Sequence, residues 1–173
     1  ANLKKFILYV LSCNLGEILT LFFSPLLGLA MPLLPIHILW INLVTDGLPG
    51  LALVAEPAEK GIMNHPPRPP KENLFAGRLV PKIVITGSIM AMASIFTQWW
   101  TARQGYDIRT QQTAVFTILC FIQLGNALSV RSMYHSMFSN RWLANKGMWG
   151  AIGLTVALQL FIIYIPALQS MFK

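Results

Sequence analysis

Apolar and polar residues are segregated along the chain into long hydrophobic runs separated by polar connections. Five runs reach the roughly twenty residues that a helix needs to cross a hydrocarbon core, and they cover 3–28, 33–55, 79–101, 111–131 and 147–166. The pattern predicts an all-α, multi-pass bundle of five membrane-spanning helices. We expect it to form a single transmembrane domain over residues 1–173, with a proline-rich cytoplasmic loop at 56–78.

Composition agrees with lipid as the solvent of this chain. Hydrophobic residues make up 55% of it and charged residues only 11%, against about 25% charged residues in soluble domains. The chain begins with Ala1 and has no signal-peptide pattern, so we expect a piece of a longer protein. Cys13 and Cys120 fall inside apolar runs without CxxC spacing, which indicates packed thiols.

The net charge of +7 sets the orientation of the bundle and does not indicate nucleic-acid binding. Ten of the thirteen basic residues fall on one side of the predicted spans, and the positive-inside rule makes that side cytoplasmic. The cytoplasmic set is Lys4, Lys5, Lys60, Arg68, Lys71, Arg78, Lys82, Arg131, Arg141 and Lys146, and the outer set is Arg103, Arg109 and Lys173.

Two acidic residues, Glu17 and Asp46, lie within apolar runs. An ionisable group at membrane depth costs at least ~2.5 kcal/mol on insertion scales, so each is a functional-site hypothesis. At ~1.5 Å per residue, each lies roughly 16 Å below the outer surface of its helix. Because the two helices are antiparallel, we expect the carboxylates at equal depth and within reach of each other.

Polar neighbours accompany both acids. Asn14 precedes Glu17 by three positions, and Asn42, Thr45 and Asp46 stand at i, i+3 and i+4. These spacings place side chains on one helix face. The sequence therefore predicts a cluster of side-chain oxygens contributed by two helices.

A helix breaker follows Asp46. Pro49 has no amide hydrogen, so the Thr45 carbonyl loses its helical donor, and Gly47 and Gly50 let the backbone open. A freed carbonyl at membrane depth is tolerated only where a cavity, an ion or another group satisfies it. We expect the second helix to be interrupted near Asp46–Pro49, with backbone oxygens added to the cluster.

Oxygen ligands favour a hard cation, with Ca²⁺ first and Mn²⁺ or Na⁺ behind it. In the fourth run Gln123 and Asn126 lie three apart, and either amide could be a ligand or could bond neighbouring helices together. His37, His65 and His135 are interpreted as non-ligands. The predicted metal ligands are Asn14, Glu17, Asn42, Thr45, Asp46 and Gln123.

Several motifs resemble the calcium-type P-type ATPases. SCNLGE (12–17), LLPIHILWINLVTDGLPGLAL (33–53) and IMNHPPRPPKENLF (62–75) are similar to the fifth and sixth membrane helices of that family and the loop that follows them. QLGNALSVRS (123–132) resembles the end of its eighth helix. The resemblance covers the fifth to the ninth membrane helices.

The resemblance implies that an ion binds between membrane helices while phosphorylation of a cytoplasmic aspartate drives alternating access. Asn14 and Glu17 match ion ligands of the fifth helix, and Asn42, Thr45 and Asp46 match those of the sixth. Gln123 stands where pumps that carry two calcium ions have a glutamate, which leaves the number of ions open.

The same resemblance implies partners outside this chain. They are the transported cation, the first four membrane helices, and the cytoplasmic domains that phosphorylate the pump and use ATP and Mg²⁺. Alone, the chain should neither hydrolyse ATP nor pump, and it carries no catalytic or cofactor-binding residue. We expect a multi-pass integral membrane protein, in the plasma membrane if the source is prokaryotic.

Two other classes of function remain open from the residues. Glu17 and Asp46 could share a proton as the carboxylate pair of an intramembrane aspartyl protease, although such enzymes use two aspartates, commonly in YD and GxGD motifs. A purely structural bundle would use Asn14, Thr45 and Pro49 only for helix packing.

Overall fold

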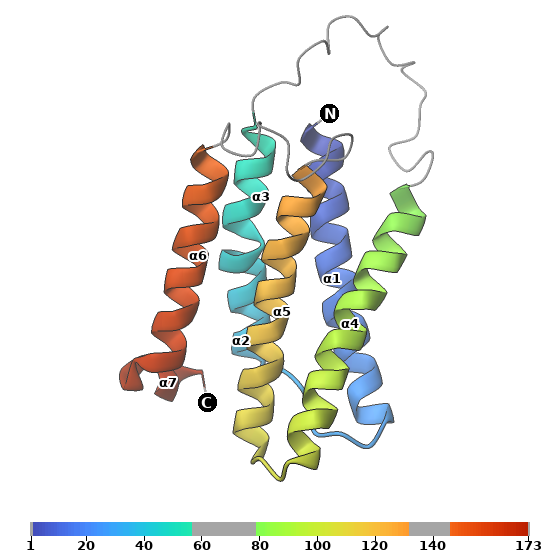
Figure 1. Cartoon of the computed structure of the whole chain (residues 1–173), viewed down its shortest axis with the longest axis vertical. Helices are drawn as coiled ribbons and strands as arrows, with labels where there is room; N and C mark the ends of the chain where they lie inside the picture. Colours follow the sequence, from blue (N-terminus) through green and yellow to red (C-terminus); the bar gives the residue numbers. More distant parts are fainter. Residues whose placement is uncertain (1, 57–78, 132–145, 173) are drawn as a thin grey trace, which may run out of the picture.

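The computed structural model describes residues 2–56, 79–131 and 146–172. The described chain is helical and forms an elongated bundle whose long helices run side by side (Figure 1). The proline-rich loop predicted at 56–78 falls, beyond Glu56, outside the described residues. The elements are α1 (Asn2–Leu26), α2 (Pro35–Trp40), η1 (Ile41–Thr45), α3 (Gly47–Val54), α4 (Leu79–Arg103), α5 (Ile108–Arg131), α6 (Lys146–Tyr164) and α7 (Pro166–Met171).

The prediction of an all-α membrane bundle is confirmed. Within the described residues, five helices are long and apolar enough to cross a membrane, and no strand is present. The second of these spans, Pro35–Val54, is assembled from α2, η1 and α3. The described residues therefore contain a five-span helical bundle in which only the second span is broken.

Two prolines set the start of helices α2 and α7. Leu34 and Ile165 have extended backbones, with φ/ψ of −82°/158° and −87°/116°, because the ring of a following proline disfavours the helical conformation. Pro35 then opens α2, and Pro166 opens α7. The short helix α7 was not predicted from the sequence, in which the fifth span was expected to cover 147–166.

Helices α1 and α4 approach closely through two glycines. A Cβ atom added to Gly16 would lie 2.9 Å from the Cβ of Met90, and one added to Gly87 would lie 3.0 Å from the Cβ of Leu15. Small residues allow membrane helices to pack backbone against backbone where lipid supplies no hydrophobic drive. This contact fixes the position of α1 against α4.

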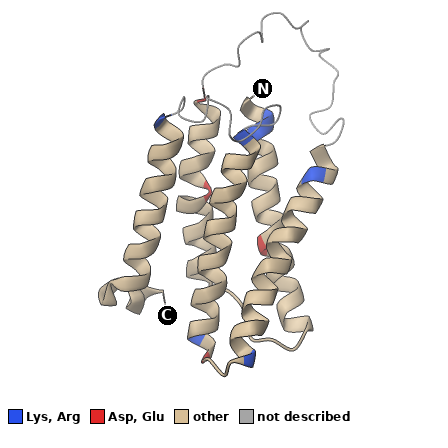
Figure 2. Cartoon of the chain, viewed as in Figure 1, with Lys and Arg blue, Asp and Glu red and all other residues tan. Residues whose placement is uncertain are grey.

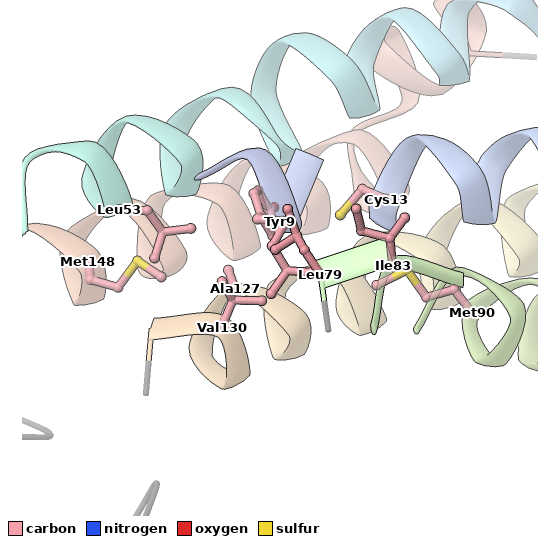
Figure 3. Packing of buried hydrophobic residues seen from close by; sticks show 10 residues of the cluster. Tyr9, Cys13, Leu53, Leu79, Ile83, Met90, Ala127, Val130 and Met148 are labelled. Atoms are coloured by element: carbon pink, nitrogen blue, oxygen red, sulfur yellow. The ribbon is translucent and has the colours of Figure 1, made fainter. Parts of the chain in front are cut away.

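Two clusters of buried apolar side chains hold the bundle, one on each side of its middle. The first joins α1, α3, α4, α5 and α6 (Figure 3), and the second lies toward the end of the bundle where α2 begins. Along α5, Cys120 belongs to the second cluster and Ala127 to the first, with Gln123 between them. The polar residues of interest therefore occupy a layer between two apolar cores.

Charged residues are distributed as the topology argument requires. Lys and Arg positions lie near the two ends of the bundle, whereas acidic positions also occur along its middle (Figure 2). The cytoplasmic assignment of the end that carries Lys5, Arg131 and Lys146 stays a prediction from the positive-inside rule.

Candidate cation-binding site

The carboxylate of Glu17 is shared by three spans. Its side chain is 3% exposed. Gln123 of α5 donates from Nε2 to Oε1 at 2.8 Å, and Asn42 of η1 donates from Nδ2 to Oε2 at 3.0 Å. The amides thus satisfy both oxygens of the acid, and they join α1, η1 and α5 at one point.

The second buried acid, Asp46, is held by a different residue. Its side chain is 4% exposed, and Oδ1 accepts a hydrogen bond of 3.2 Å from the hydroxyl of Tyr9. The same hydroxyl lies 3.1 Å from the carbonyl oxygen of Thr45. Asp46 Oδ2 is buried and has no hydrogen-bond partner within the described part of the chain. One oxygen of Asp46 is therefore available to a ligand.

The second span is interrupted, as predicted, but by a π turn at Ile41–Thr45, just before the predicted Asp46–Pro49. Asp46 donates its backbone N–H to the carbonyl of Ile41 at 2.8 Å, a five-residue step, and α3 starts again at Gly47. Pro49 is the third residue of α3, in the first turn, where helical N–H groups lack intrahelical partners. The Thr45 carbonyl that Pro49 leaves without a donor is bonded by Tyr9.

The two acids are staggered along the bundle, whereas we expected equal depth. Asn42 pairs with Glu17, and the thiol of Cys13 lies near Asp46. Since Cys13 and Glu17 are four residues apart, the carboxylates differ in level by about one helical turn, roughly 6 Å. Counting inward from the helix ends missed this offset because α1 ends at Leu26 and η1 alters the rise of the second span.

The remaining predicted ligands differ in how closely they approach the acids. Thr45 is buried and donates from Oγ1 to the sulfur of Cys120 at 3.5 Å. Asn42 is exposed on one side and also donates to the carbonyl of Ile38 at 2.9 Å. Asn14 is half-buried and forms no side-chain hydrogen bond to another described residue. Its role as a ligand stays a prediction.

Sequence reasoning did not identify Tyr9 as part of the site. The signal that could have found it is a stripe of polar and small residues that recurs every three or four positions along α1. Such a stripe predicts the face that packs against other helices. Its buried members are Tyr9, Ser12, Cys13, Gly16, Glu17, Thr20 and Ser24.

The histidine and the two cysteines in the described residues that were not predicted as ligands are all buried. His37 is buried near the start of α2, where Nδ1 accepts from the Leu34 N–H at 3.2 Å and Nε2 lies 3.0 Å from the Phe172 carbonyl oxygen. Cys13 and Cys120 are both free and buried, as predicted. His65 and His135 lie outside the described residues.

The chemistry of this cluster suits a cation with oxygen ligands. Among the described residues, no three His, Cys, Asp or Glu side chains form a group that could hold a metal ion. A cation would therefore need amide, hydroxyl or carbonyl oxygens beside the two carboxylates, a donor set that Ca²⁺ accepts and zinc or copper does not prefer. The buried Oε1 of Gln123 has no hydrogen-bond partner in the described part. It is an oxygen already available at the cluster.

Comparison with known proteins identifies the family. Residues 30–173 match the family described as cation transporting ATPase, C-terminus. The chain is 41% identical over 172 residues to a calcium-transporting ATPase of Bacillus subtilis, and that match covers 99% of the chain and 19% of the relative.

Other relatives agree. Calcium-transporting ATPase 1 of Bacillus cereus is 38% identical over 187 residues, covering 99% of the chain and 21% of the relative. Calcium-transporting ATPase type 2C member 1 of Mus musculus is 31% identical over 172 residues, covering 99% and 19%. The chain thus spans about a fifth of the length of these relatives. From this agreement it follows that the chain belongs to the cation-transporting ATPase family and matches its C-terminal membrane region.

Proposed function

We propose that this chain is the ion-binding membrane portion of an ATP-driven pump that transports Ca²⁺ by alternating access. The observation that carries the proposal is the Glu17 carboxylate, buried at membrane depth and shared by α1, η1 and α5. A buried acid bonded from three separate spans is sensitive to any relative movement of them. The names of the bacterial and mouse relatives support calcium as the cargo.

The cluster can exist in two arrangements that differ in what satisfies the acids. In the structure, N–H donors from Asn42 and Gln123 satisfy Glu17, and the Tyr9 hydroxyl satisfies one oxygen of Asp46. A side-chain amide carries an oxygen opposite its NH₂ group, and rotation about its last bond exchanges the two. An arriving cation would take over the role of the N–H donors while the amides turn their oxygens toward it.

Charge balance favours a divalent cation at this cluster. Two carboxylates offset the charge of one Ca²⁺, and calcium tolerates six to eight oxygens in irregular geometry at ~2.3–2.6 Å. The proposed ligands are Glu17, Asp46, Asn42, Thr45 and Gln123, with Asn14 as a further member. Mn²⁺ and Na⁺ are alternative hard cations for the same oxygens.

Energy for transport would come from parts of the pump outside this chain. The sequence contains no Asp-Lys-Thr-Gly phosphorylation motif, and the relatives are about five times as long. We assign ATP and Mg²⁺ to those missing cytoplasmic domains. The segment by itself is proposed to bind the ion without hydrolysing ATP.

The protease alternative is disfavoured by the partners of the two acids. A catalytic carboxylate pair shares one proton between neighbouring oxygens. Here each Glu17 oxygen is bonded by an amide, and the described hydrogen bonds link Asp46 to Tyr9 rather than to Glu17. The pair also differs in level by about one helical turn.

Binding of ⁴⁵Ca²⁺ and ATP-driven Ca²⁺ uptake in vesicles test the proposal. The intact protein that carries this chain would be compared with its Glu17→Gln and Asp46→Asn variants, which keep size and remove charge. We expect both variants to lose high-affinity binding and uptake. Asp107→Asn is the matched control, because that acid lies just before α5, outside the spans. If both variants take up Ca²⁺ at the wild-type level, the proposed site is refuted. Uptake of Mn²⁺ or Na⁺ in place of Ca²⁺ would reassign the ion.

A further inference from the structure

A second polar network lies at the end of the bundle opposite α7, where α1 begins and α3 and α5 end. The carboxylate of Glu56 accepts from Arg131 Nε at 2.7 Å and lies 3.7 Å from Lys5 Nζ. Lys5 also donates to the backbone carbonyl of Arg131 at 2.8 Å. We name Lys5, Glu56 and Arg131 the charge clamp.

Asn2 strengthens the connection between the first and second spans at this level. Its Nδ2 atom donates to the carbonyl oxygens of Val54 at 3.1 Å and Glu56 at 2.6 Å. These are carbonyls at the end of α3, where the helix has no further N–H donors of its own. The start of α1 thus closes the end of α3 and holds Glu56 at the centre of the clamp.

The clamp is withdrawn from solvent. The exposed fractions are 3% for Lys5, 12% for Glu56 and 9% for Arg131. Of these three side chains, Glu56 is the anion and it contacts both cations. Removing one member of a buried ion pair is far more costly than removing an exposed one, because an uncompensated charge stays behind.

The three segments joined by the clamp are those that meet at Glu17. Lys5 and Glu17 are on α1, Arg131 and Gln123 are on α5, and Glu56 directly follows the span that carries Asn42 and Asp46. At ~1.5 Å per residue the clamp lies about 12 to 18 Å from the acids along the helices. Helices are stiff over such lengths, so an offset at the clamp is carried to the cluster.

We propose that the charge clamp is a positioning device that sets the apparent Ca²⁺ affinity of the cluster by fixing the relative heights of the three spans. This inference rests on the proposed function and adds residues that touch no ion. Glu56 is the central member, since it contacts both cations and begins the proline-rich connection at 56–78. A displacement of that connection would reach the ligands through Glu56.

The contacts predict an unequal response to substitution. Glu56→Gln removes the carboxylate that contacts both Lys5 and Arg131, whereas Lys5→Met or Arg131→Met removes one of these two contacts. We expect Glu56→Gln to raise the Ca²⁺ concentration for half-maximal uptake by roughly tenfold, within the range of coupling between distant sites. Each single cation variant should raise it less, by about threefold or below.

The measurement is ATP-driven ⁴⁵Ca²⁺ uptake by vesicles containing the intact protein, over a range of free Ca²⁺. The half-saturating concentration does not depend on how much protein folds, so a variant that only lowers the yield changes the maximal rate alone. The double variant Glu56→Lys with Arg131→Glu keeps the net charge and restores opposite charges at positions 56 and 131, while the contact between positions 56 and 5 stays lost. It should return the half-saturating concentration to within about threefold of the wild type.

The outcomes separate this inference from the proposed function. If Glu56→Gln has the same half-saturating Ca²⁺ concentration as the wild type, the clamp is overturned and the proposed pump function is unaffected. The clamp is also overturned if the double variant has a half-saturating concentration as high as that of Glu56→Gln. A wild-type protein without ATP-driven Ca²⁺ uptake overturns both. A selective loss of affinity in Glu56→Gln, relieved by the charge swap, supports the clamp.

Discussion

Gln123 donates a 2.8 Å hydrogen bond to Glu17 across 106 positions of the sequence. The bond joins the fourth span to the first at the level of the buried acid. It also presents the amide nitrogen to Glu17 and leaves Gln123 Oε1 without a hydrogen-bond partner in the described part. Gln123 therefore satisfies one oxygen of Glu17 and keeps at the cluster an oxygen that a cation could use.

Gln123→Glu should make the stability of the bundle depend on Ca²⁺. The substitution replaces the donor to Glu17 by a second carboxylate at similar distance, and like charges so close repel strongly in a low-dielectric interior. We expect the midpoint of thermal unfolding of the intact protein to fall in chelator. Saturating Ca²⁺ should raise it by more than in the wild type, because the cation relieves the repulsion.

The matched control for this experiment is Gln98→Glu. Gln98 is also a buried glutamine, but its Nε2 donates to the carbonyl of Ala30 at 2.7 Å and to no acid in the described part of the chain. That variant should lose stability without recovery in Ca²⁺. Equal recovery in both variants would argue against a cation beside Glu17.

Tyr9→Phe should weaken both the π turn and the proposed site. The variant removes the hydroxyl that bonds the Thr45 carbonyl at 3.1 Å and Asp46 Oδ1 at 3.2 Å. We expect a loss of about 1 to 2 kcal/mol in the free energy of unfolding and lower affinity for ⁴⁵Ca²⁺. Tyr164→Phe is the control, since that exposed side chain lies on α6. Equal losses of stability and Ca²⁺ affinity in the two variants would show that the Tyr9 hydroxyl does not support the site.

Gly16→Ala tests the close contact between α1 and α4. The added methyl group would lie 2.9 Å from the Cβ of Met90, so the helices must separate. Overpacking of this kind costs about 1 to 3 kcal/mol. Gly125→Ala meets no atom within 4 Å and should be neutral or stabilising by about 0.5 to 1 kcal/mol, since alanine favours helix. Thermal unfolding of both variants measures this difference in stability. The two variants would be equally stable if α1 and α4 were packed loosely.

Cysteine labelling can determine the orientation of the bundle. Tyr106→Cys introduces a thiol in the exposed connection between α4 and α5, and Gly147→Cys introduces one at the exposed start of α6. The native Cys13 and Cys120 are buried and should give little background. In right-side-out vesicles, a membrane-impermeant maleimide should label position 106 directly and position 147 only after permeabilisation. The reverse pattern would invert the assigned topology.

Much of the candidate site was accessible from sequence because its signals are local. The charge of Glu17 or Asp46 is conspicuous in an apolar run whatever surrounds it, and the missing amide of Pro49 frees a carbonyl in any helix. Cluster membership was harder to predict. From the sequence, the Gln123 amide could be a ligand or could only bond neighbouring helices together. Tyr9 was not identified, and its role follows from the contacts of its hydroxyl with Thr45 and Asp46.

By itself the sequence determined the five spans, the break in the second, and two acids at membrane depth, because apolar length and proline chemistry act within a single segment. Only the tertiary structure decided the stagger of those acids, the amide donors to Glu17, and the clamp that Glu56 forms with Lys5 and Arg131. Those features depend on the register between helices. That register is set by close contacts such as Gly16 against Met90 and by the extra residue in the π turn, and neither follows from the composition of one helix.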